Sequence, residues 1–253
     1  SGAVSSHWAM LSDESMPDTS GTDRPDERRR QERRKLEGAD FRRINFGCGP
    51  FPLERWLKTD GGDGRIFEAP DDPRIVALDV WEFLGHVPSN AVEYITSEQF
   101  FEHFDRHEGH RLIREWYRVL KPGGVLRIQC PDLEKEIRIY LDMLDGVSWE
   151  DTVLPHRIRH IGQSSEPSAK LVEGERYTRA MLINNGMRLD GHKFIYDFET
   201  LAQSLSLAGF RQIVRERFGR STHAPFQGID RHDGGETGRH WIPGIVLTVE
   251  ATK

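Results

Sequence analysis

The sequence lacks the apolar segments that membrane and secreted proteins carry. No apolar run in the chain approaches the roughly 18 residues that span a bilayer. The first residues show no charged and then apolar segment of the kind that directs secretion. We therefore expect a cytoplasmic protein with no membrane partner.

The chain also has few cysteines and little excess charge. Its two cysteines, Cys48 and Cys130, lack the paired spacing of a zinc site, and we expect both to be free thiols. A net charge of −6 with 36% hydrophobic residues gives no sign of a polyanion-binding surface, so a nucleic-acid partner is not expected. The length of 253 residues suits one domain with appendages.

The first 40 residues differ in composition from the rest. Residues 1–23 are mostly small and polar with little periodicity, so we expect disorder. Residues 24–37 alternate acids and bases at helical spacing and contain almost no apolar residue. This pattern favours a solvated charged helix or arm over a nucleic-acid patch. We expect residues 1–40 to form this N-terminal arm and residues 41–253 to form one domain.

Short apolar segments alternate with helical patterns through the domain. Five of them precede residue 131 and two follow residue 209, and each has the length and composition of a strand. They are Arg43–Phe46, Trp56–Thr59, Ile75–Leu78, Ala91–Thr96 and Val125–Cys130, then Phe210–Arg217 and Ile245–Ala251. Strands that alternate with helices predict a parallel sheet with right-handed crossovers.

Two helices are predicted from apolar residues that recur at helical spacing. The first runs from Phe100 to Leu120. The Lys-Pro-Gly-Gly segment at 121–124 should end it, because proline stops a helix and glycine permits the reversal into the next strand. The second helix, Phe198–Ala208, should end at Gly209.

A glycine-rich turn joins the first two strands. Gly47 and Gly49 have no side chains, so the backbone can turn sharply and a ligand can approach its N–H groups. Asp60 ends the next extended segment, where its carboxylate can accept hydrogen bonds from two adjacent ribose hydroxyls. This layout is typical of a nucleoside-binding site, although a Gly-x-Gly pair also occurs in ordinary tight turns.

Five ordered segments carry a family resemblance. They read Gly-Cys-Gly-Pro-x-Pro at 47–52, Phe-Glu-His-Phe at 101–104, Tyr-Arg-Val-Leu-Lys-Pro-Gly-Gly at 117–124, Pro-Asp-Leu-Glu at 131–134 and Gly-His-Lys-Phe-Ile-Tyr-Asp-Phe-Glu-Thr-Leu at 191–201. With these motifs, residues 41–252 resemble the class I S-adenosylmethionine-dependent methyltransferases. More narrowly, the chain is similar to small bacterial members of sugar, polysaccharide and secondary-metabolite pathways. The resemblance implies an α/β fold with a Rossmann-like seven-stranded sheet, mostly parallel with an antiparallel last strand, and S-adenosylmethionine as the cofactor.

The resemblance also implies which residues bind the cofactor. The full set is Phe46, Gly47, Cys48, Gly49, Asp60, Asp79, Val80, Ser97 and Glu98. Gly47 and Gly49 would face the methionine part of the cofactor, and Asp60 would hold the ribose. Asp63, in a Gly-Gly-Asp-Gly segment, is the alternative ribose ligand. We favour Asp60 because it directly ends the apolar segment, and the short spacing implies a very short first helix.

The same resemblance places the other end of the cofactor. Asp79 would lie near the adenine, with Val80 packing beside it. Ser97 and Glu98 would follow the fourth strand and lie beneath the sulfonium. These positions agree with the rule that ligands bind at the switch point of an open sheet.

Methyl transfer to a hydroxyl needs a nearby general base, because the pKa of an alcohol is high. Of the 11 histidines, His192 lies where the family builds its acceptor pocket, and Tyr196 and Asp197 are placed to orient its imidazole or bind acceptor hydroxyls. His103 is the second candidate for the base. Each histidine has a structural alternative, which is packing and helix capping for His192 and a buried backbone contact for His103.

Insertions near residues 145–197 and 219–243 are expected to shape the acceptor pocket. The basic segment 156–160 suits either a solvated helix end or a loop that binds an anionic or polyhydroxylated acceptor. Histidines and aspartates recur after residue 221, but we find no spaced carboxylate cluster and expect no metal.

The leading hypothesis is an S-adenosylmethionine-dependent O-methyltransferase that acts on a small-molecule or sugar-containing acceptor by histidine-assisted in-line transfer. An N-methyltransferase of a small metabolite is the nearest alternative. A noncatalytic cofactor-binding module and a nucleic-acid methyltransferase also remain open.

Overall fold

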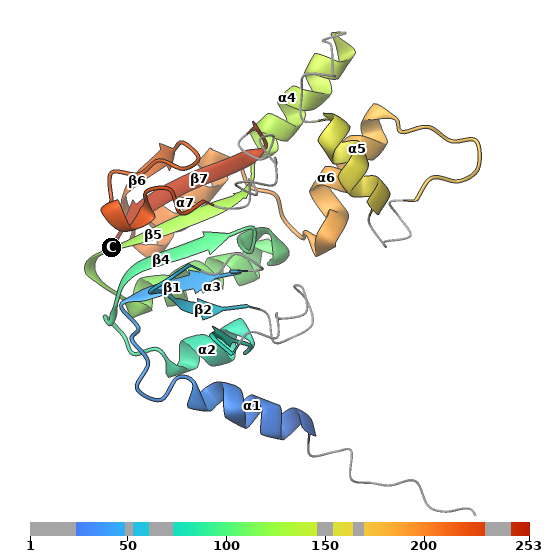
Figure 1. Cartoon of the computed structure of the whole chain (residues 1–253). Coiled ribbons are helices and arrows are strands. Elements are labelled where there is room, and N and C mark those ends of the chain that lie inside the picture. The colour runs from blue at the N-terminus through green and yellow to red at the C-terminus, as the bar shows by residue number, and fades with distance from the viewer. Residues whose placement is uncertain (1–23, 49–52, 61–72, 146–153, 164–169, 231–243) are drawn as a thin grey trace, which may run out of the picture.

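The computed structural model describes residues 24–48, 53–60, 73–145, 154–163, 170–230 and 244–253. Within these ranges one seven-stranded sheet has the order β3-β2-β1-β4-β5-β7-β6 (Figure 1). The strands are β1 Arg43–Phe46, β2 Leu57–Thr59, β3 Ile75–Val76, β4 Val92–Glu98, β5 Leu120–Pro131, β6 Arg211–Glu216 and β7 Val246–Thr252.

The strand directions confirm the predicted fold class. Strands β1 to β5 pair in parallel, and β7 runs antiparallel to both of its neighbours, β5 and β6. The chain first builds outward from β1 to β3 and then returns to place β4 on the other side of β1. The switch point therefore lies between the carboxyl ends of β1 and β4, where open α/β sheets bind ligands.

Seven α-helices and three short 3-10 turns accompany the sheet in the described ranges. The helices are α1 Arg24–Arg34, α2 Val80–His86, α3 Arg106–Val119, α4 Leu133–Leu144, α5 Leu154–Gln163, α6 Arg179–Arg188 and α7 Phe198–Ala208. The turns are η2 Phe101–His103, η4 Leu189–Gly191 and η5 Ala224–Phe226. In the part of the chain that the structure describes, none of these helices combines the length and apolar character that crossing a membrane requires.

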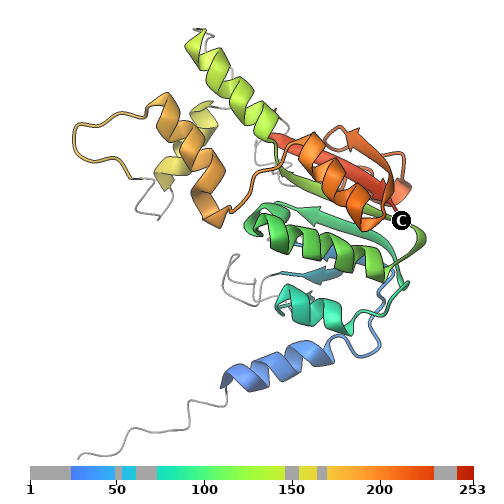
Figure 2. The same ribbon diagram turned by 180° about the vertical axis from the view of Figure 1, so that it is seen from behind.

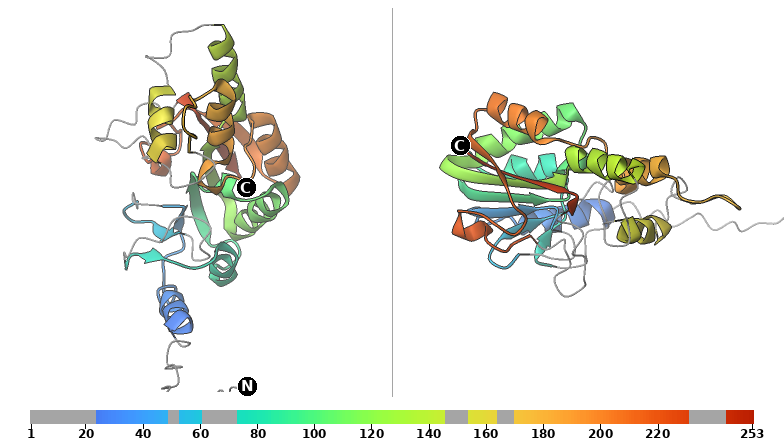
Figure 3. Two further views of the ribbon diagram at one scale, coloured as in Figure 1. Left: turned by 90° about the vertical axis from the view of Figure 1, so that its right-hand side faces the viewer. Right: turned by 90° about the horizontal axis from the view of Figure 1, so that it is seen from above.

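Helices α2, α3 and α7 cover one face of the sheet (Figures 2 and 3). Ile44 and Ile95 point to this side from the central strands, and Phe83, Trp116 and Leu201 meet them from the helices. All five side chains are fully buried. Burial of such side chains is the dominant favourable contribution to folding, so this layer is the core that fixes the sheet.

The opposite face of the sheet is polar although it is buried. The strand registers align Lys58, Asn45, Thr96, Arg127 and Glu250 in one row across β2, β1, β4, β5 and β7. Each of the five is at most 5% exposed. Alternate residues of a strand face opposite sides, so the same strands present apolar residues to the helices and polar residues to this face.

A loop held by buried ion pairs covers part of the polar face. The Arg127 guanidinium lies 2.5 Å from a carboxylate oxygen of Asp230 and 2.5 Å from one of Glu250. Burial raises the pKa of the Asp230 carboxyl, and the hydrogen bond from Arg127 opposes this rise. Phe226 of η5 stacks on Trp56 with ring centroids 5.9 Å apart. The segment that ends at Asp230 is thus fixed across β5.

The predicted helix from Phe100 to Leu120 is wrong as one continuous element. It divides into η2 and α3, with extended backbone at Phe104 between them. Asp105 caps α3 by accepting from the backbone N–H groups of His107 and Glu108, and the Glu108 side chain accepts from the Asp105 N–H. This capping box starts a new helix, so η2 is free to turn toward the strand ends.

Residues 121–124 were expected to form the turn between the helix and the next strand, but in the structure they lie within that strand. Strand β5 begins at Leu120, and its pairing with β4 shifts between Val92 and Tyr94. Gly123 has φ +79°, and a Cβ on Gly124 would lie 2.9 Å from the Lys121 carbonyl oxygen. The two glycines therefore form an irregular bulge within the strand.

Helix α1 forms within the charged segment and contacts the domain, which the expectation of a solvated arm did not include. Arg29 and Arg33 both pair with Glu82 of α2. Glu32 is buried, accepts from the backbone N–H of Ala77 and pairs with Lys35. Residues 1–23, for which we expected disorder, lie outside the described residues.

Helices α4, α5 and α6 stand apart from the sheet (Figure 1). They share a small apolar cluster of Met143, Ile161 and Leu182. Helices α5 and α6 lie within the insertion expected near residues 145–197. The remaining part of the second expected insertion, residues 231–243, lies outside the described residues.

Candidate functional site

Strand β1 ends in a turn that only glycine fits. Gly47 has φ +65°, and its N–H donates to the Thr59 carbonyl oxygen over 3.0 Å. A Cβ at this position would lie 2.5 Å from Cβ of Phe100. The buried Gly47 turn is therefore held against Phe100, in the segment that follows β4. Gly49, the second glycine of the motif, lies outside the described residues.

A buried carboxylate follows β2. Asp60 is 2% exposed, and its backbone N–H donates to the Val76 carbonyl oxygen over 3.4 Å. Its neighbour Thr59 pairs with Phe46 across the strands, so Asp60 lies beside the Gly47 turn. Asp63, the alternative ribose ligand, lies outside the described residues.

Polar side chains also gather where β4 ends. Ser97 and Glu98 are the last residues of β4, whereas we expected them to follow the strand. Ser97 is fully buried, and its hydroxyl has no hydrogen-bond partner among the described residues. Gln99 then adopts φ +49° and donates its N–H to the Gln129 carbonyl oxygen. This left-handed residue turns the chain from β4 into η2.

These features fit an adenosine-containing cofactor. A glycine turn, a buried carboxylate beside it and a buried hydroxyl lacking a partner in the described structure occupy the ends of β1, β2 and β4. Backbone N–H groups in such a turn suit a charged ligand group, and a carboxylate suits ribose hydroxyls.

The other residues expected at the cofactor have structural contacts. Asp79 caps α2 by accepting from the N–H groups of Trp81 and Glu82, at 2.9 and 3.3 Å. Val80 and Phe46 belong to the core. Cys48 and Cys130 are both buried free cysteines, as expected.

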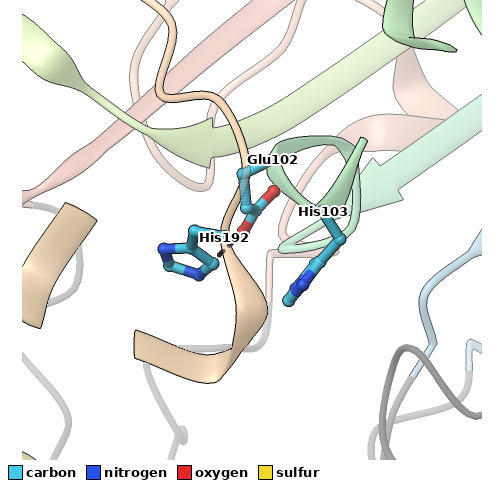
Figure 4. A group of neighbouring side chains, drawn as sticks. All are labelled: Glu102, His103 and His192. Atoms are coloured by element: carbon cyan, nitrogen blue, oxygen red, sulfur yellow. Dashed lines mark ion pairs between the residues drawn. The ribbon is translucent and has the colours of Figure 1, made fainter. Parts of the chain in front are cut away.

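A cluster of three ionisable side chains lies next to the end of β4. Glu102 and His103 belong to η2, and His192 follows the turn of Asp190 and Gly191, which have φ +61° and +79°. We call Glu102, His103 and His192 the carboxylate–imidazole cluster (Figure 4). The two predicted histidines, far apart in sequence, are thus brought together.

Backbone hydrogen bonds fix the two segments of this cluster to each other. The N–H groups of Lys193 and Phe194 both donate to the Glu102 carbonyl oxygen, over 2.8 and 3.3 Å. These two hydrogen bonds hold η2 against the 190–194 turn. They therefore bring Glu102 close to His192, although the two residues belong to different elements.

The side chains of the cluster lie close together, and Glu102 and His192 form an ion pair when the imidazole is protonated. The Glu102 Oε1 and His192 Nε2 atoms are 3.9 Å apart (Figure 4). The rings of His103 and His192 have centroids 5.2 Å apart at an interplanar angle of 73°. One nitrogen or oxygen atom from each residue lies within 4.8 Å of the others. The three therefore surround a common point.

Burial strongly shifts the protonation of the cluster. Desolvation raises the pKa of Glu102 to about 8, and the nearby Asp190 contributes to this rise. Desolvation and then the neighbouring His192 lower the pKa of His103 to about 4, against opposing contributions from Asp190 and the backbone of Gly191 and Gln99. At neutral pH His103 is therefore an uncharged imidazole with a lone pair available.

Glu102 was missed by the sequence analysis, although it stands inside the Phe-Glu-His-Phe motif. It is fully buried, and neither of its carboxylate oxygens has a hydrogen-bond partner in the described part of the chain. A charged residue inside the apolar run of Phe100, Phe101 and Phe104 was the available signal, because buried carboxylates are almost always paired or functional.

Tyr196 and Asp197 lie away from the cluster's centre. Tyr196 is buried between Phe101 and Phe194, and burial raises the pKa of its phenol. Asp197 caps α7 by accepting from the Thr200 N–H over 2.8 Å, and this bonding lowers the pKa of Asp197. Both residues therefore have structural contacts that account for their positions.

The remaining polar candidates are dispersed. His107 lies exposed on α3, and His223 packs on Tyr94 at the opposite face of the sheet. The basic segment 156–160 lies within α5, where the side chains of His156 and His160 are outside the described part.

Comparison with known proteins adds a family match. Residues 65–128 match the methyltransferase domain family. The matched segment contains β3, α2, β4, η2 and α3, and therefore includes Glu102 and His103. The expected seven-stranded sheet with an antiparallel last strand is present as well. The family match indicates a methyltransferase domain. No curated protein matches the sequence.

Several solved methyltransferase structures resemble this fold. One is an S-adenosylmethionine-dependent methyltransferase from Archaeoglobus fulgidus, with 16% identity and a TM-score of 0.45, over 90% of this chain and 94% of that one. Another is a possible histamine N-methyltransferase from Thermotoga maritima, with 13% identity and a TM-score of 0.45, over 91% and 94%.

A third is phosphoethanolamine N-methyltransferase 2 from Haemonchus contortus in complex with S-adenosyl-L-methionine. It has 10% identity and a TM-score of 0.43, over 90% of this chain and 52% of that chain. These likenesses do not identify the acceptor of the methyl group.

Proposed function

We propose that this methyltransferase transfers a methyl group to a hydroxyl of a small-molecule or sugar-containing acceptor. The acceptor would bind beside the carboxylate–imidazole cluster and lose its hydroxyl proton there. The cofactor would lie over the ends of β1, β2 and β4.

The observation that supports this proposal most is the convergence of His103 and His192 next to the end of β4. An alcohol is a poor nucleophile until its proton is removed, and a positioned group that takes the proton contributes roughly 10²- to 10⁴-fold in rate. An amine acceptor needs less assistance. A buried polar cluster at this place therefore favours oxygen as the acceptor atom.

The described residues also support a binding mode for the cofactor. When bound, S-adenosylmethionine supplies an electrophilic methyl group on a sulfonium. Asp60 would accept hydrogen bonds from the ribose hydroxyls, and the Gly47 turn would face the methionine part. Ser97, whose buried hydroxyl has no partner in the described structure, would lie below the sulfonium.

A methyl-transfer assay tests the proposal. Labelled S-adenosylmethionine would be incubated with panels of sugar, phenol and amine acceptors, with wild-type protein and a His192→Ala variant. We expect transfer to a hydroxyl compound and a rate at least about 100-fold lower in the variant. His107→Ala is the matched control, because this exposed histidine on α3 is not a member of the cluster, and it should retain the wild-type rate.

Preferred transfer to amines, with His192→Ala as active as wild type, would contradict the proposal. Binding of the cofactor product without transfer to any acceptor in the panels would instead favour a noncatalytic binding module.

A further inference from the structure

We propose that Glu102, His103 and His192 bind a divalent transition-metal ion of the zinc type. Two imidazoles and one carboxylate form a donor set that zinc and other first-row divalent ions use in proteins. This inference replaces the expectation from sequence that the chain has no metal site, and it deepens the proposed function of the same cluster.

The distances within the cluster suit ligands of one ion. Zinc binds imidazole nitrogen and carboxylate oxygen at about 2.0–2.2 Å, which separates two ligand atoms by roughly 3.3 Å in tetrahedral geometry. Glu102 Oε1 and His192 Nε2 are 3.9 Å apart, and the three ligand atoms lie within 4.8 Å of one another. A separation of 3.9 Å exceeds a hydrogen bond, and coordination would draw these two atoms together to roughly 3.3 Å.

The burial of Glu102 is the second, independent observation. Its side chain is fully buried and both oxygens are without a hydrogen-bond partner in the described part of the chain. His103 is 4% exposed, and its Nδ1 atom likewise has none there. Buried polar atoms that lack partners call for an explanation such as a bound ion. A cation at the centre of the cluster would give the carboxylate and this nitrogen their missing partner.

The backbone holds the proposed ligands in place before an ion arrives. His103 and Glu102 are neighbours in η2, and His192 is tied to them because Lys193 and Phe194 donate to the Glu102 carbonyl oxygen. Metal sites require ligands that surrounding hydrogen bonds keep oriented. The turn at Asp190 and Gly191 supplies this orientation for His192.

Three protein ligands leave a coordination position open, as in catalytic zinc sites. This step rests on the proposed function, because the open position would take the acceptor hydroxyl oxygen. Coordination would lower the pKa of a bound hydroxyl, so its proton would pass to solvent, and His103 and His192 would promote this loss as metal ligands rather than by taking the proton. The oxygen then forms a bond to the methyl carbon while the carbon–sulfur bond breaks, which yields the methyl ether and S-adenosylhomocysteine.

The test measures metal binding separately from activity. Protein without a polyhistidine tag would be stripped with a chelator and titrated with Zn²⁺ by calorimetry, and Co²⁺ would be followed by its visible absorption. We expect one tight site per chain. Glu102→Gln and His192→Ala should each weaken binding at least about 10- to 100-fold, whereas His107→Ala should bind like wild type.

Circular dichroism would establish that each variant is folded, and Glu102→Gln keeps the shape of the side chain. Folded wild-type protein that binds no ion, or variants that bind it as tightly as wild type, would overturn the inference. S-adenosylhomocysteine binding would be measured on the same samples. Cofactor binding without metal binding would remove the metal site alone, and metal binding without cofactor binding would instead remove the proposed function.

Discussion

Replacing Gly47 with alanine tests whether the turn after β1 is built as the structure indicates. Gly47 has φ +65°, and an added Cβ would lie 2.5 Å from Cβ of Phe100. A left-handed conformation costs a non-glycine residue about 1–2 kcal/mol. Extra atoms in a packed site cost about a further 1–3 kcal/mol. We therefore expect Gly47→Ala to lower the free energy of unfolding by about 2–5 kcal/mol.

Gly38→Ala is the matched control for this prediction. Gly38 has φ +74°, but a Cβ there would meet no atom within 4 Å. This variant should show only the conformational cost of about 1–2 kcal/mol. The difference between the two variants isolates the contact with Phe100.

Urea denaturation of wild type and both variants measures these changes. Thermal unfolding gives a second readout, because 1 kcal/mol shifts Tm by about 2–4 °C in a protein of this size. The Gly47→Ala variant should also bind S-adenosylhomocysteine more weakly, since the turn faces the proposed cofactor site. Equal destabilisation by the two variants would refute the argument that Phe100 confines the turn.

Three further predictions concern the polar contacts of the fold. Asp230→Ala should lower the free energy of unfolding, measured by urea denaturation, by about 3 kcal/mol, because buried Arg127 loses one of its two ion-pair partners. A decrease of under about 1 kcal/mol would contradict this. Asp197→Ala should lower the free energy of unfolding by about 1 kcal/mol without changing kcat. Asp197→Ser should keep the wild-type stability, because serine can also cap α7. Hydrogen bonding to Thr200 holds the pKa of Asp197 below its ordinary value, so the stabilisation by the cap is present at neutral pH and is lost as the pH falls through the lowered pKa. The free energies of unfolding of wild type and Asp197→Ala should therefore become equal in acid. A tenfold lower kcat of Asp197→Ala would instead indicate a catalytic role. Asp105→Ala should cost about 1 kcal/mol and speed amide exchange in the first turn of α3, and unchanged exchange would count against the capping box.

The sheet could be predicted from sequence because its signals are local. Each strand is a short apolar segment, and the family resemblance implied seven strands with an antiparallel last one. Gly47 and Asp60 mark strand ends by residue type alone, and the structure places both at the switch-point edge.

The helix boundary at Asp105 shows where periodicity was insufficient. Apolar residues continue at helical spacing from Phe100 to Leu120, so the pattern favoured one helix. The Asp-x-x-Glu signal at 105–108 marks a helix start, and in the structure this cap prevails. The same type of signal at Asp79 and Glu82 explains why Asp79 serves as a cap of α2.

The membership of Glu102 in the cluster could not be read from local sequence. Its position depends on the contact between η2 and the 190–194 turn, which are far apart in the chain. Periodicity describes neighbours within one element and carries no information on such a contact. The two histidines were identified by residue chemistry and by resemblance, whereas a single glutamate in an apolar run attracted no such attention.

Calorimetric titration with S-adenosylhomocysteine tests the central claim most directly. Wild-type protein should bind one molecule with micromolar affinity. Asp60→Asn, which keeps the size of the buried side chain, should bind about 10- to 150-fold more weakly, because hydrogen bonds to a charged group contribute about 1.5–3 kcal/mol. Folded wild-type protein that does not bind would contradict the assignment as an S-adenosylmethionine-dependent methyltransferase, and unchanged binding by the variant would contradict the role of Asp60.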